Sequence, residues 1–358
     1  MLNLLNDISL ATMNTLQMNV RADRFCRIRT ESELGMLIAD GRLQRGRWFV
    51  LGGGSNILFT QDYDGLILKM DIKGVRVALE DCDTVLLDVK AGENWPDLVA
   101  AVVAKGWGGI ENLALIPGTA GAAPIQNIAA YGHNLSDTLV SVDAVDSQSG
   151  KNRRFTAEEC KPGYRTSVFK EDLKNRYIIT GIRLQLTKKP RLNTTYQSRY
   201  ESVDQELAVI ANPPYRVSDV FQAIVNIRRR KLPDIEVVGS AGSIFKNPVV
   251  TRETLVRIRK TCPGIHFYPL EQLSYGHIDT QKGTIPERVK IPAAWLIEET
   301  GWAGKRVGSC GIWPTQPLNI VNYGGATAMD ILDLVNSVKA RVLKKYGVQL
   351  ELEIELVS

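Results

Sequence analysis

The sequence predicts an α+β fold with more than one domain. Apolar residues alternate at 75–79 and again at 85–89, on either side of a short polar turn, which is typical of an antiparallel hairpin. Helical patterns occur singly between such strands. The 358 residues exceed one domain of about 150 residues. A regular βαβα alternation, the sign of a doubly wound sheet, is not visible, so a Rossmann fold is disfavoured.

Local signals predict the elements in order. Four helices are expected, because each has capping or stop residues at its ends. They begin after Thr30, after Asn94, near Ser218 and after Thr327. A strand is expected at 140–145, and 193–214 is polar enough to be a domain boundary or a long surface loop.

The end of the chain has the strictest alternation. From 348 to 357 apolar residues alternate with polar ones, which predicts a strand that returns to an earlier sheet. Glu351, Glu353 and Glu355 would share one face of it. By default such a row is the solvated face of a half-buried strand.

Composition limits the classes of function. The chain is 44% hydrophobic and 23% charged, which excludes a disordered, collagen-like or disulfide-scaffold protein. The net charge of +5 suits anionic small ligands but is too small to indicate a nucleic-acid partner.

No sequence signal indicates export, a membrane or a metal. Residues 1–20 lack the basic and apolar regions of a signal peptide, and no run approaches the roughly 18 apolar residues of a membrane helix. The 5 cysteines are dispersed and odd in number, and only 3 histidines are present. We therefore expect a cytoplasmic protein with no membrane partner and no metal site.

Two glycine-rich segments are candidate ligand loops. Residues 52–56, Gly-Gly-Gly-Ser-Asn, follow an apolar strand, and small residues there let the backbone approach a phosphate. The segment matches neither the dinucleotide fingerprint nor the Walker loop, and a tight turn is the alternative. Residues 108–132 form a long, nearly uncharged loop, and irregular loops of that length are usually functional, although close packing would also explain it.

Other polar residues have two interpretations each. Arg165 is a natural partner for a carboxylate, but a surface arginine is the commoner explanation. The basic run 228–231 either binds a diphosphate or complements the dipole at a helix end, and we favour the second. Ser240 and Ser243 do not fit the nucleophile elbow, so a serine hydrolase is disfavoured.

Taken together, the motifs resemble the UDP-N-acetylenolpyruvoylglucosamine reductase family in their order along the chain. The matching segments are 51–59, 111–118, 124–128, 130–132, 163–165, 231–233, 241–248 and the final Leu-Glu-Leu-Glu. Residues 194–196, Thr-Thr-Tyr, are similar to the form with a tyrosine loop over the substrate. Residues 14–17 and 312–316 depart from the usual pattern.

The resemblance implies a non-Rossmann FAD-binding fold of two α+β subdomains plus a third, substrate-binding α+β domain. We expect the first subdomain at 1–71, joined by the C-terminal strand 348–358, the second at 72–214 and the third at 215–347. FAD would be noncovalent, since no histidine lies near 52–56. The implied cofactor-binding residues are Leu51, Gly52, Gly53, Gly54, Ser55, Asn56, Pro117, Gly118, Gly121, Ala122, Gln126, Asn127, Ala130, Tyr131 and Gly132.

The implied activity is that of an oxidoreductase in peptidoglycan precursor synthesis. NADPH reduces the flavin, flavin N5 passes a hydride to C3 of the enolpyruvyl ether of a UDP-sugar, and Ser243 donates a proton to C2. Arg165 and Glu353 match the residues at the substrate carboxylate, where negative charge must be stabilised. The implied substrate-binding residues are Tyr164, Tyr196, Lys231, Asn247 and Gln316.

Two other functions stay open. One is an FAD-dependent alcohol or sugar oxidase of the same fold, which would have no reason to keep the 242–248 motif or the strand that contains Glu353. The other is a nucleotide-sugar binder without turnover, against which the joint presence of Arg165, Ser243 and Glu353 argues.

Overall fold

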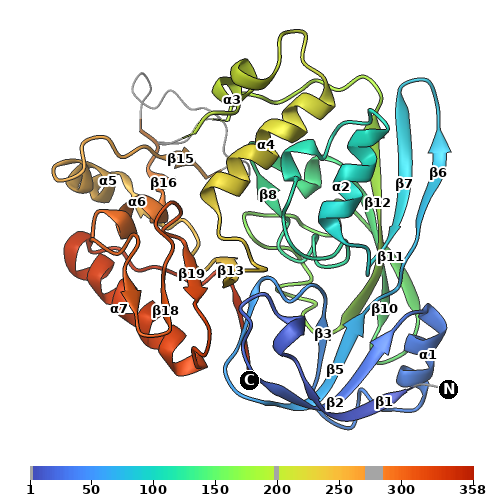
Figure 1. Ribbon diagram of the computed structural model, residues 1–358. Helices are drawn as coiled ribbons and strands as arrows, with labels where there is room; N and C mark the ends of the chain where they lie inside the picture. Colours follow the sequence, from blue (N-terminus) through green and yellow to red (C-terminus); the bar gives the residue numbers. More distant parts are fainter. Residues whose placement is uncertain (1–2, 197–200, 271–284) are drawn as a thin grey trace.

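The computed structural model describes residues 3–196, 201–270 and 285–358, and it confirms the α+β class (Figure 1). A first sheet has the strand order β1-β2-β5-β3. These strands are β1 (Leu4–Ser9), β2 (Arg21–Ile28), β5 (Tyr63–Met70) and β3 (Trp48–Leu51), with α1 (Glu31–Ala39) between β2 and β3. β2, β5 and β3 run parallel, which the sequence analysis did not predict; polar residues interrupt the apolar run of β2, Arg-Ala-Asp-Arg-Phe-Cys-Arg-Ile, which hides the continuous pattern typical of buried parallel strands.

The second sheet is antiparallel and contains the predicted hairpin. Its order is β11-β10-β12-β7-β6. The strands are β6 (Val75–Glu80), β7 (Thr84–Lys90), β10 (Leu139–Asp146), β11 (Asn152–Thr156) and β12 (Tyr177–Thr187). β6 pairs with β7 from Val75 opposite Val89 onward. Helix α2 (Trp95–Ala104) follows this hairpin, and small elements line the long loop after it: 3-10 turns Glu111–Leu113 and Leu135–Asp137, β8 (Ala129–Ala130) and β9 (His133–Asn134).

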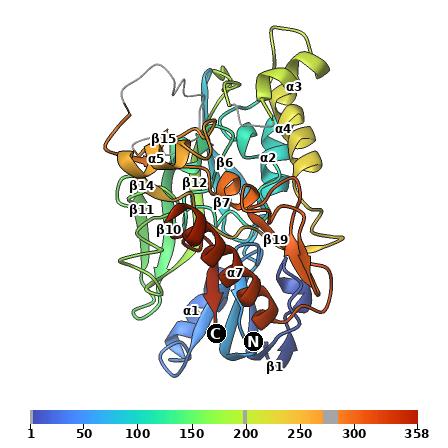
Figure 2. The ribbon, with the colours of Figure 1, turned by 90° about the vertical axis from the view of Figure 1, so that its left-hand side faces the viewer.

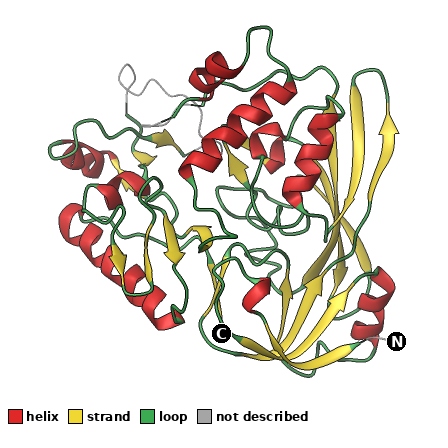
Figure 3. Cartoon of the chain, viewed as in Figure 1, coloured by secondary structure: helices red, strands yellow, loops and turns green. Residues whose placement is uncertain are grey.

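The C-terminal part contains two small sheets with helices around them (Figure 3). One has the order β13-β19-β18-β17 and the other β14-β16-β15. The strands are β13 (Gly239–Ser243), β14 (Val249–Thr251), β15 (Tyr268–Pro269), β16 (Arg288–Lys290), β17 (Arg306–Val307), β18 (Cys310–Ile312) and β19 (Asn319–Asn322). The helices are α5 (Arg252–Arg259), α6 (Ala293–Glu298) and α7 (Ala328–Tyr346), and Figure 2 shows α7 on the face turned toward the viewer. None of the described helices has the length and apolarity needed to cross a membrane.

The helix predictions are confirmed where capping signals supported them. Capping boxes are present at Thr30 and Thr327, and the Asn94 side chain caps α2. Helix α4 (Val217–Lys231) ends just before Pro233. The polar segment 193–214 is not irregular throughout, because it contains α3 (Val203–Ile210), whose N-terminus is capped by the Ser202 hydroxyl.

The predicted long C-terminal strand is wrong in extent. Only β20 (Glu355–Val357) is a strand, and it pairs in parallel with β4 (Ile57–Phe59). Leu352 makes an isolated bridge with Phe245 before the chain bends. The bend breaks the alternation, so Glu351 is exposed whereas Glu353 is 7% exposed.

Two buried clusters meet at the first sheet. On β2, Cys26 and Ile28 pack with the second sheet, whereas Ala22 and Phe25 pack with the C-terminal helices. The parallel strands of the first sheet are therefore buried on both faces, whereas β1 at its edge is mostly exposed. Helix α4, expected in the third domain, packs against α2 and α3. The proposed boundaries 1–71, 72–214 and 215–347 remain a prediction.

The two glycine-rich segments, 52–56 and 108–132, are in close backbone contact. A Cβ atom on Gly53 would lie 2.7 Å from the Cα of Gly118. Gly118 itself has φ +131°, which side chains disfavour. The two glycine-rich segments therefore need their glycines to pack against each other. The contact confirms that close packing explains part of the glycine content of these segments.

We expect Gly53→Ala to lower the free energy of unfolding by about 1–3 kcal/mol, because the new methyl group meets backbone that cannot move aside. Gly35→Ala is the matched control. Gly35 lies inside α1, and an added Cβ meets nothing within 4 Å. Alanine there should stabilise the protein by about 0.5–1 kcal/mol. Urea unfolding of both variants tests this, and equal midpoints would contradict it.

Candidate functional site

A cavity of about 580 Å³ lies where the two glycine-rich loops meet the C-terminal segment. Segments distant in sequence form its wall: 48–57, 116–130, 165–179, 241–243 and 353–356. Among them are Arg165, Ser243 and Glu353, the three residues expected to be catalytic. The fold thus brings both candidate loops and all three residues to one enclosed space.

The glycine loops present a surface rich in backbone donors. Among the described residues, the backbone N–H groups of Gly53, Gly54, Ser55 and Asn56 donate to no protein acceptor. The Ser55 hydroxyl donates to the Pro117 carbonyl at 2.8 Å, which joins the two loops. Consecutive free N–H groups without bulky side chains form an anion-binding concavity, so these residues fit the diphosphate of FAD.

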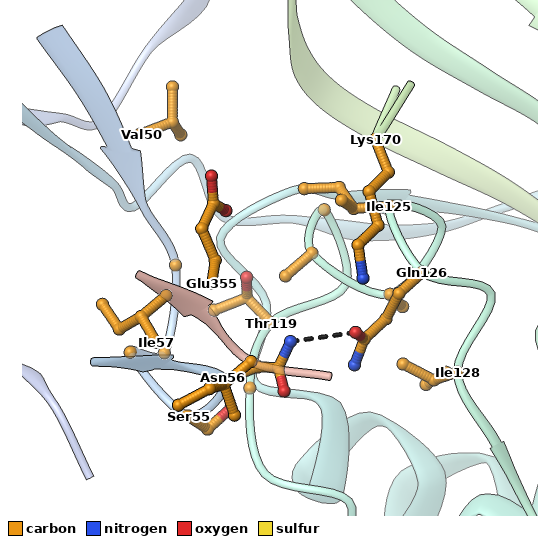
Figure 4. A pocket seen from close by; sticks show the side chains of 18 of the residues that line it. Val50, Ser55, Asn56, Ile57, Thr119, Ile125, Gln126, Ile128, Lys170 and Glu355 are labelled. Carbon is orange, nitrogen blue, oxygen red and sulfur yellow. Dashed lines mark hydrogen bonds between the residues drawn. The ribbon is translucent and has the colours of Figure 1, made fainter. Parts of the chain in front are cut away.

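Polar side chains cross the cavity between the two loops. The Asn56 amide donates to Gln126 Oε1 at 2.9 Å, and Figure 4 shows these side chains facing each other. Lys170 points toward the same space (Figure 4), and its ammonium donates to the Arg165 carbonyl at 3.2 Å. Burial, and to a lesser extent the nearby Lys246, lowers the pKa of Lys170. Lys69 donates to the Gly52 carbonyl, and burial lowers its pKa as well.

Most of the residues expected at the cofactor line this cavity. They are Leu51, Gly52, Gly53, Gly54, Ser55, Asn56, Pro117, Gly118, Gly121, Ala122, Gln126 and Ala130. Asn127, Tyr131 and Gly132 do not line it. Asn127 holds the neighbouring turn, since its amide donates to the Gly163 carbonyl at 3.3 Å. The Gly132 carbonyl accepts from Asn193 at 3.1 Å. Burial raises the pKa of Tyr131 to about 12.

Arg165 and Glu353 form an ion pair in the cavity wall. Arg165 Nε lies 3.1 Å from Glu353 Oε1, and their side chains are 17% and 8% exposed. Arg165 has φ +56°, an uncommon conformation for a residue with a side chain. It occupies the tight turn in which the Gly163 N–H donates to the Thr166 carbonyl at 3.0 Å. The surroundings thus hold the guanidinium toward the C-terminal segment.

Ser243 is next to this ion pair through the backbone. The backbone N–H of Glu353 donates to the Ile244 carbonyl at 2.8 Å, and the backbone N–H of Lys246 donates to the Glu351 carbonyl at 3.0 Å. These bonds bind the C-terminal segment to the residues that follow β13. Of the glutamates expected on one solvated face, Glu353 instead turns inward, and Glu355 contacts Lys174 at 2.8 Å. The solvated-face interpretation is therefore wrong for Glu353.

The residues expected to bind substrate lie outside the cavity wall, in two groups. In one, the Asn247 N–H donates to the Tyr164 hydroxyl at 3.1 Å. In the other, Lys231 lies 3.7 Å from Glu201, and its carbonyl accepts from Trp313 at 3.1 Å in the segment that contains Gln316. Tyr196 packs edge-on against Tyr131, with ring centroids 5.0 Å apart.

Sequence reasoning did not assign several residues that line the cavity to the site, among them Thr119, Lys170 and Arg228. Lys170 lies five residues after Arg165, within the segment already singled out. Arg228 was assigned to the helix dipole together with its basic neighbours. The helical period could have separated the half-buried Arg228 from its exposed neighbours, because Arg228 lies four residues after the buried Ile224, on the apolar stripe of α4.

Two family models match the chain. One described as UDP-N-acetylenolpyruvoylglucosamine reductase, C-terminal domain, matches residues 233–357, and one described as FAD binding domain matches residues 22–156. The first match contains Ser243 and Glu353, and the second contains both glycine loops. FAD is thus supported as the cofactor.

Similar proteins match along the whole chain. The UDP-N-acetylenolpyruvoylglucosamine reductase of Amoebophilus asiaticus is 38% identical and is covered over 100% of both chains. That of Bdellovibrio bacteriovorus is 39% identical, with coverage of 97% of this chain and 98% of the relative. The crystal structure of the Thermus caldophilus enzyme has a TM-score of 0.66 at 23% identity over 100% of both chains, which supports the fold. On this evidence the chain belongs to the UDP-N-acetylenolpyruvoylglucosamine reductase family.

Proposed function

We propose that the protein is an NADPH-dependent flavoenzyme that reduces the enolpyruvyl ether of a UDP-sugar to UDP-N-acetylmuramate. The observation that carries this proposal is the meeting of Arg165, Ser243 and Glu353 with both glycine loops at one cavity. Three segments more than 70 residues apart in sequence supply these side chains. A binder without turnover has no need of this arrangement.

Each part of the cavity has a role in the proposed reaction. The loops at 53–56 and 117–122 would hold FAD, which when bound would supply hydride chemistry to C3 of the enolpyruvyl group. Arg165 stabilises the negative charge that develops on the substrate carboxylate. Glu353 holds the guanidinium of Arg165 in place through their ion pair. Ser243 donates the proton to C2, which requires a strongly basic carbon close to the hydroxyl.

Spectroscopy of the purified protein tests the proposed function. NADPH should bleach the visible absorbance of the bound FAD. The enolpyruvyl UDP-sugar should then restore this absorbance in the absence of oxygen. Recovery only in the presence of oxygen would favour an oxidase. A colourless protein that cannot be reconstituted with FAD would support a binder without turnover.

The FAD should be noncovalent, because no histidine lines the described cavity wall. Acid precipitation should therefore release all of the flavin into the supernatant. Flavin that stays with the pellet after washing would contradict this expectation. Absorbance of both fractions gives the measurement.

Ser243→Ala should keep flavin reduction by NADPH and slow the second half-reaction by about 10²–10⁴-fold, since only that step needs the proton. Stopped-flow absorbance measures the two steps separately. The neighbouring Ser240 provides a control, because it is 1% exposed and its hydroxyl donates to the Ile320 carbonyl at 3.1 Å. Ser240→Ala should affect stability more than either half-reaction. Equal slowing of both steps by Ser243→Ala would make that residue structural.

Glu353→Ala should slow reoxidation by the enolpyruvyl substrate more than Glu353→Gln does, because the glutamine side-chain oxygen can still accept a hydrogen bond from the Arg165 guanidinium, whereas alanine leaves Arg165 without this partner. Glu351→Gln is the matched control, since Glu351 is exposed two residues away. It should stay within about 0.5 kcal/mol of wild-type stability and keep both rates. Three equally mild variants would overturn the assignment of Glu353.

A further inference from the structure

Arg228 differs from the other basic residues at the end of α4. It alone of the run 228–231 lines the cavity. Arg229 and Arg230 are exposed, and Arg230 pairs with Glu206 at 2.6 Å. Lys231 lies near Glu201 and outside the cavity wall. The helix-dipole interpretation therefore leaves Arg228 unexplained.

The surroundings of Arg228 hold its guanidinium without neutralising it. One terminal nitrogen donates to the Leu115 carbonyl at 3.1 Å. Leu115 has φ +53°, an uncommon conformation that turns this loop. Arg228 Nε is buried and has no hydrogen-bond partner among the described residues. A buried donor without an acceptor is costly, so it indicates a partner that the protein itself does not supply.

No described carboxylate is paired with Arg228. Burial lowers the pKa of Arg228, and the side chain that acts on it is Tyr131, which forms a hydrogen bond with the guanidinium. Burial raises the pKa of the Tyr131 phenol to about 12, so this partner is neutral at ordinary pH and does not cancel the positive charge. An arginine in a protein stays protonated. The cavity therefore contains a positive charge that lacks an anion, whereas the charge of Arg165 is matched by Glu353.

We propose that Arg228 supplies the positive charge that stabilises the reduced, anionic state of the flavin. This inference rests on the proposed binding of FAD in the cavity. A flavin that accepts a hydride gains negative charge on its pyrimidine edge, and a fixed cation beside that edge makes the reduction more favourable. The guanidinium also presents several donors to the ring oxygens. We do not assign Arg228 to the diphosphate of the substrate. Lys231 and Tyr196, which are expected to bind the substrate, lie outside the cavity wall, whereas Arg228 is part of it.

The midpoint potential of the bound flavin tests this proposal without turnover. It is measured on the FAD-loaded protein against a reference dye, without NADPH or sugar nucleotide, at saturating FAD. Arg228→Gln should reduce the equilibrium constant for two-electron reduction at least tenfold, which is a potential about 30 mV more negative. Arg228→Lys should recover part of this loss, because it restores the charge. Arg230→Gln, with the same change in charge on the exposed side of α4, should leave the potential unchanged.

Two results would overturn the proposal. One is an unchanged potential in Arg228→Gln at saturating FAD. The other is an equally lowered potential in Arg228→Gln and Arg228→Lys, which would indicate a packing role. If Arg228→Gln does not fold, Arg228→Met is measured in its place at saturating FAD. Equal midpoint potentials in Arg228→Met and Arg228→Lys would then overturn the proposal. Absence of FAD binding in the wild type would instead defeat the proposed function.

Discussion

The close contact between the backbones at Gly53 and Gly118 is the constraint on which the site depends. A side chain at Gly53 would overlap the opposite backbone, so the two loops approach only because neither carries one there. Their approach allows the Ser55 hydroxyl to donate a hydrogen bond to the Pro117 carbonyl and the Asn56 amide to donate one to Gln126. It also leaves a row of backbone N–H groups facing the cavity. The same glycines allow the close packing and leave backbone N–H groups for the proposed ligand, so the two interpretations are compatible.

The C-terminal segment completes the site by crossing back to the start of the chain. β20 pairs with β4 directly after the first glycine loop, so residues 353–356 become part of the cavity wall. The bend before β20 turns Glu353 inward, onto Arg165. The same segment bonds to Ile244 beside Ser243. The segment that ends in this short strand therefore connects the first glycine-rich loop to the residues proposed for chemistry.

The cavity wall contains two ion pairs and two further basic side chains, Lys170 and Arg228. Arg165 faces Glu353 and Lys174 faces Glu355, so these cations are compensated. Lys170 donates to a backbone carbonyl and lies near both glutamates. Arg228 has no such carboxylate partner among the described residues. A cavity with surplus positive charge is suited to ligands that bring or develop negative charge.

The sequence by itself determined the helix ends, the 75–89 hairpin, the α+β class and the two glycine loops. Capping residues, alternation and runs of glycine act within a few residues of the backbone they specify, so they are visible without the fold. It did not determine the parallel strands, the helix inside 193–214, the inward turn of Glu353 or the place of Arg228 in the cavity wall. Those features depend on contacts with segments far away in the chain: Glu353 turns because residues 352 and 355 pair with 245 and 57. Which side of a strand or helix is buried was decided by the tertiary structure, because burial is a property of the neighbours.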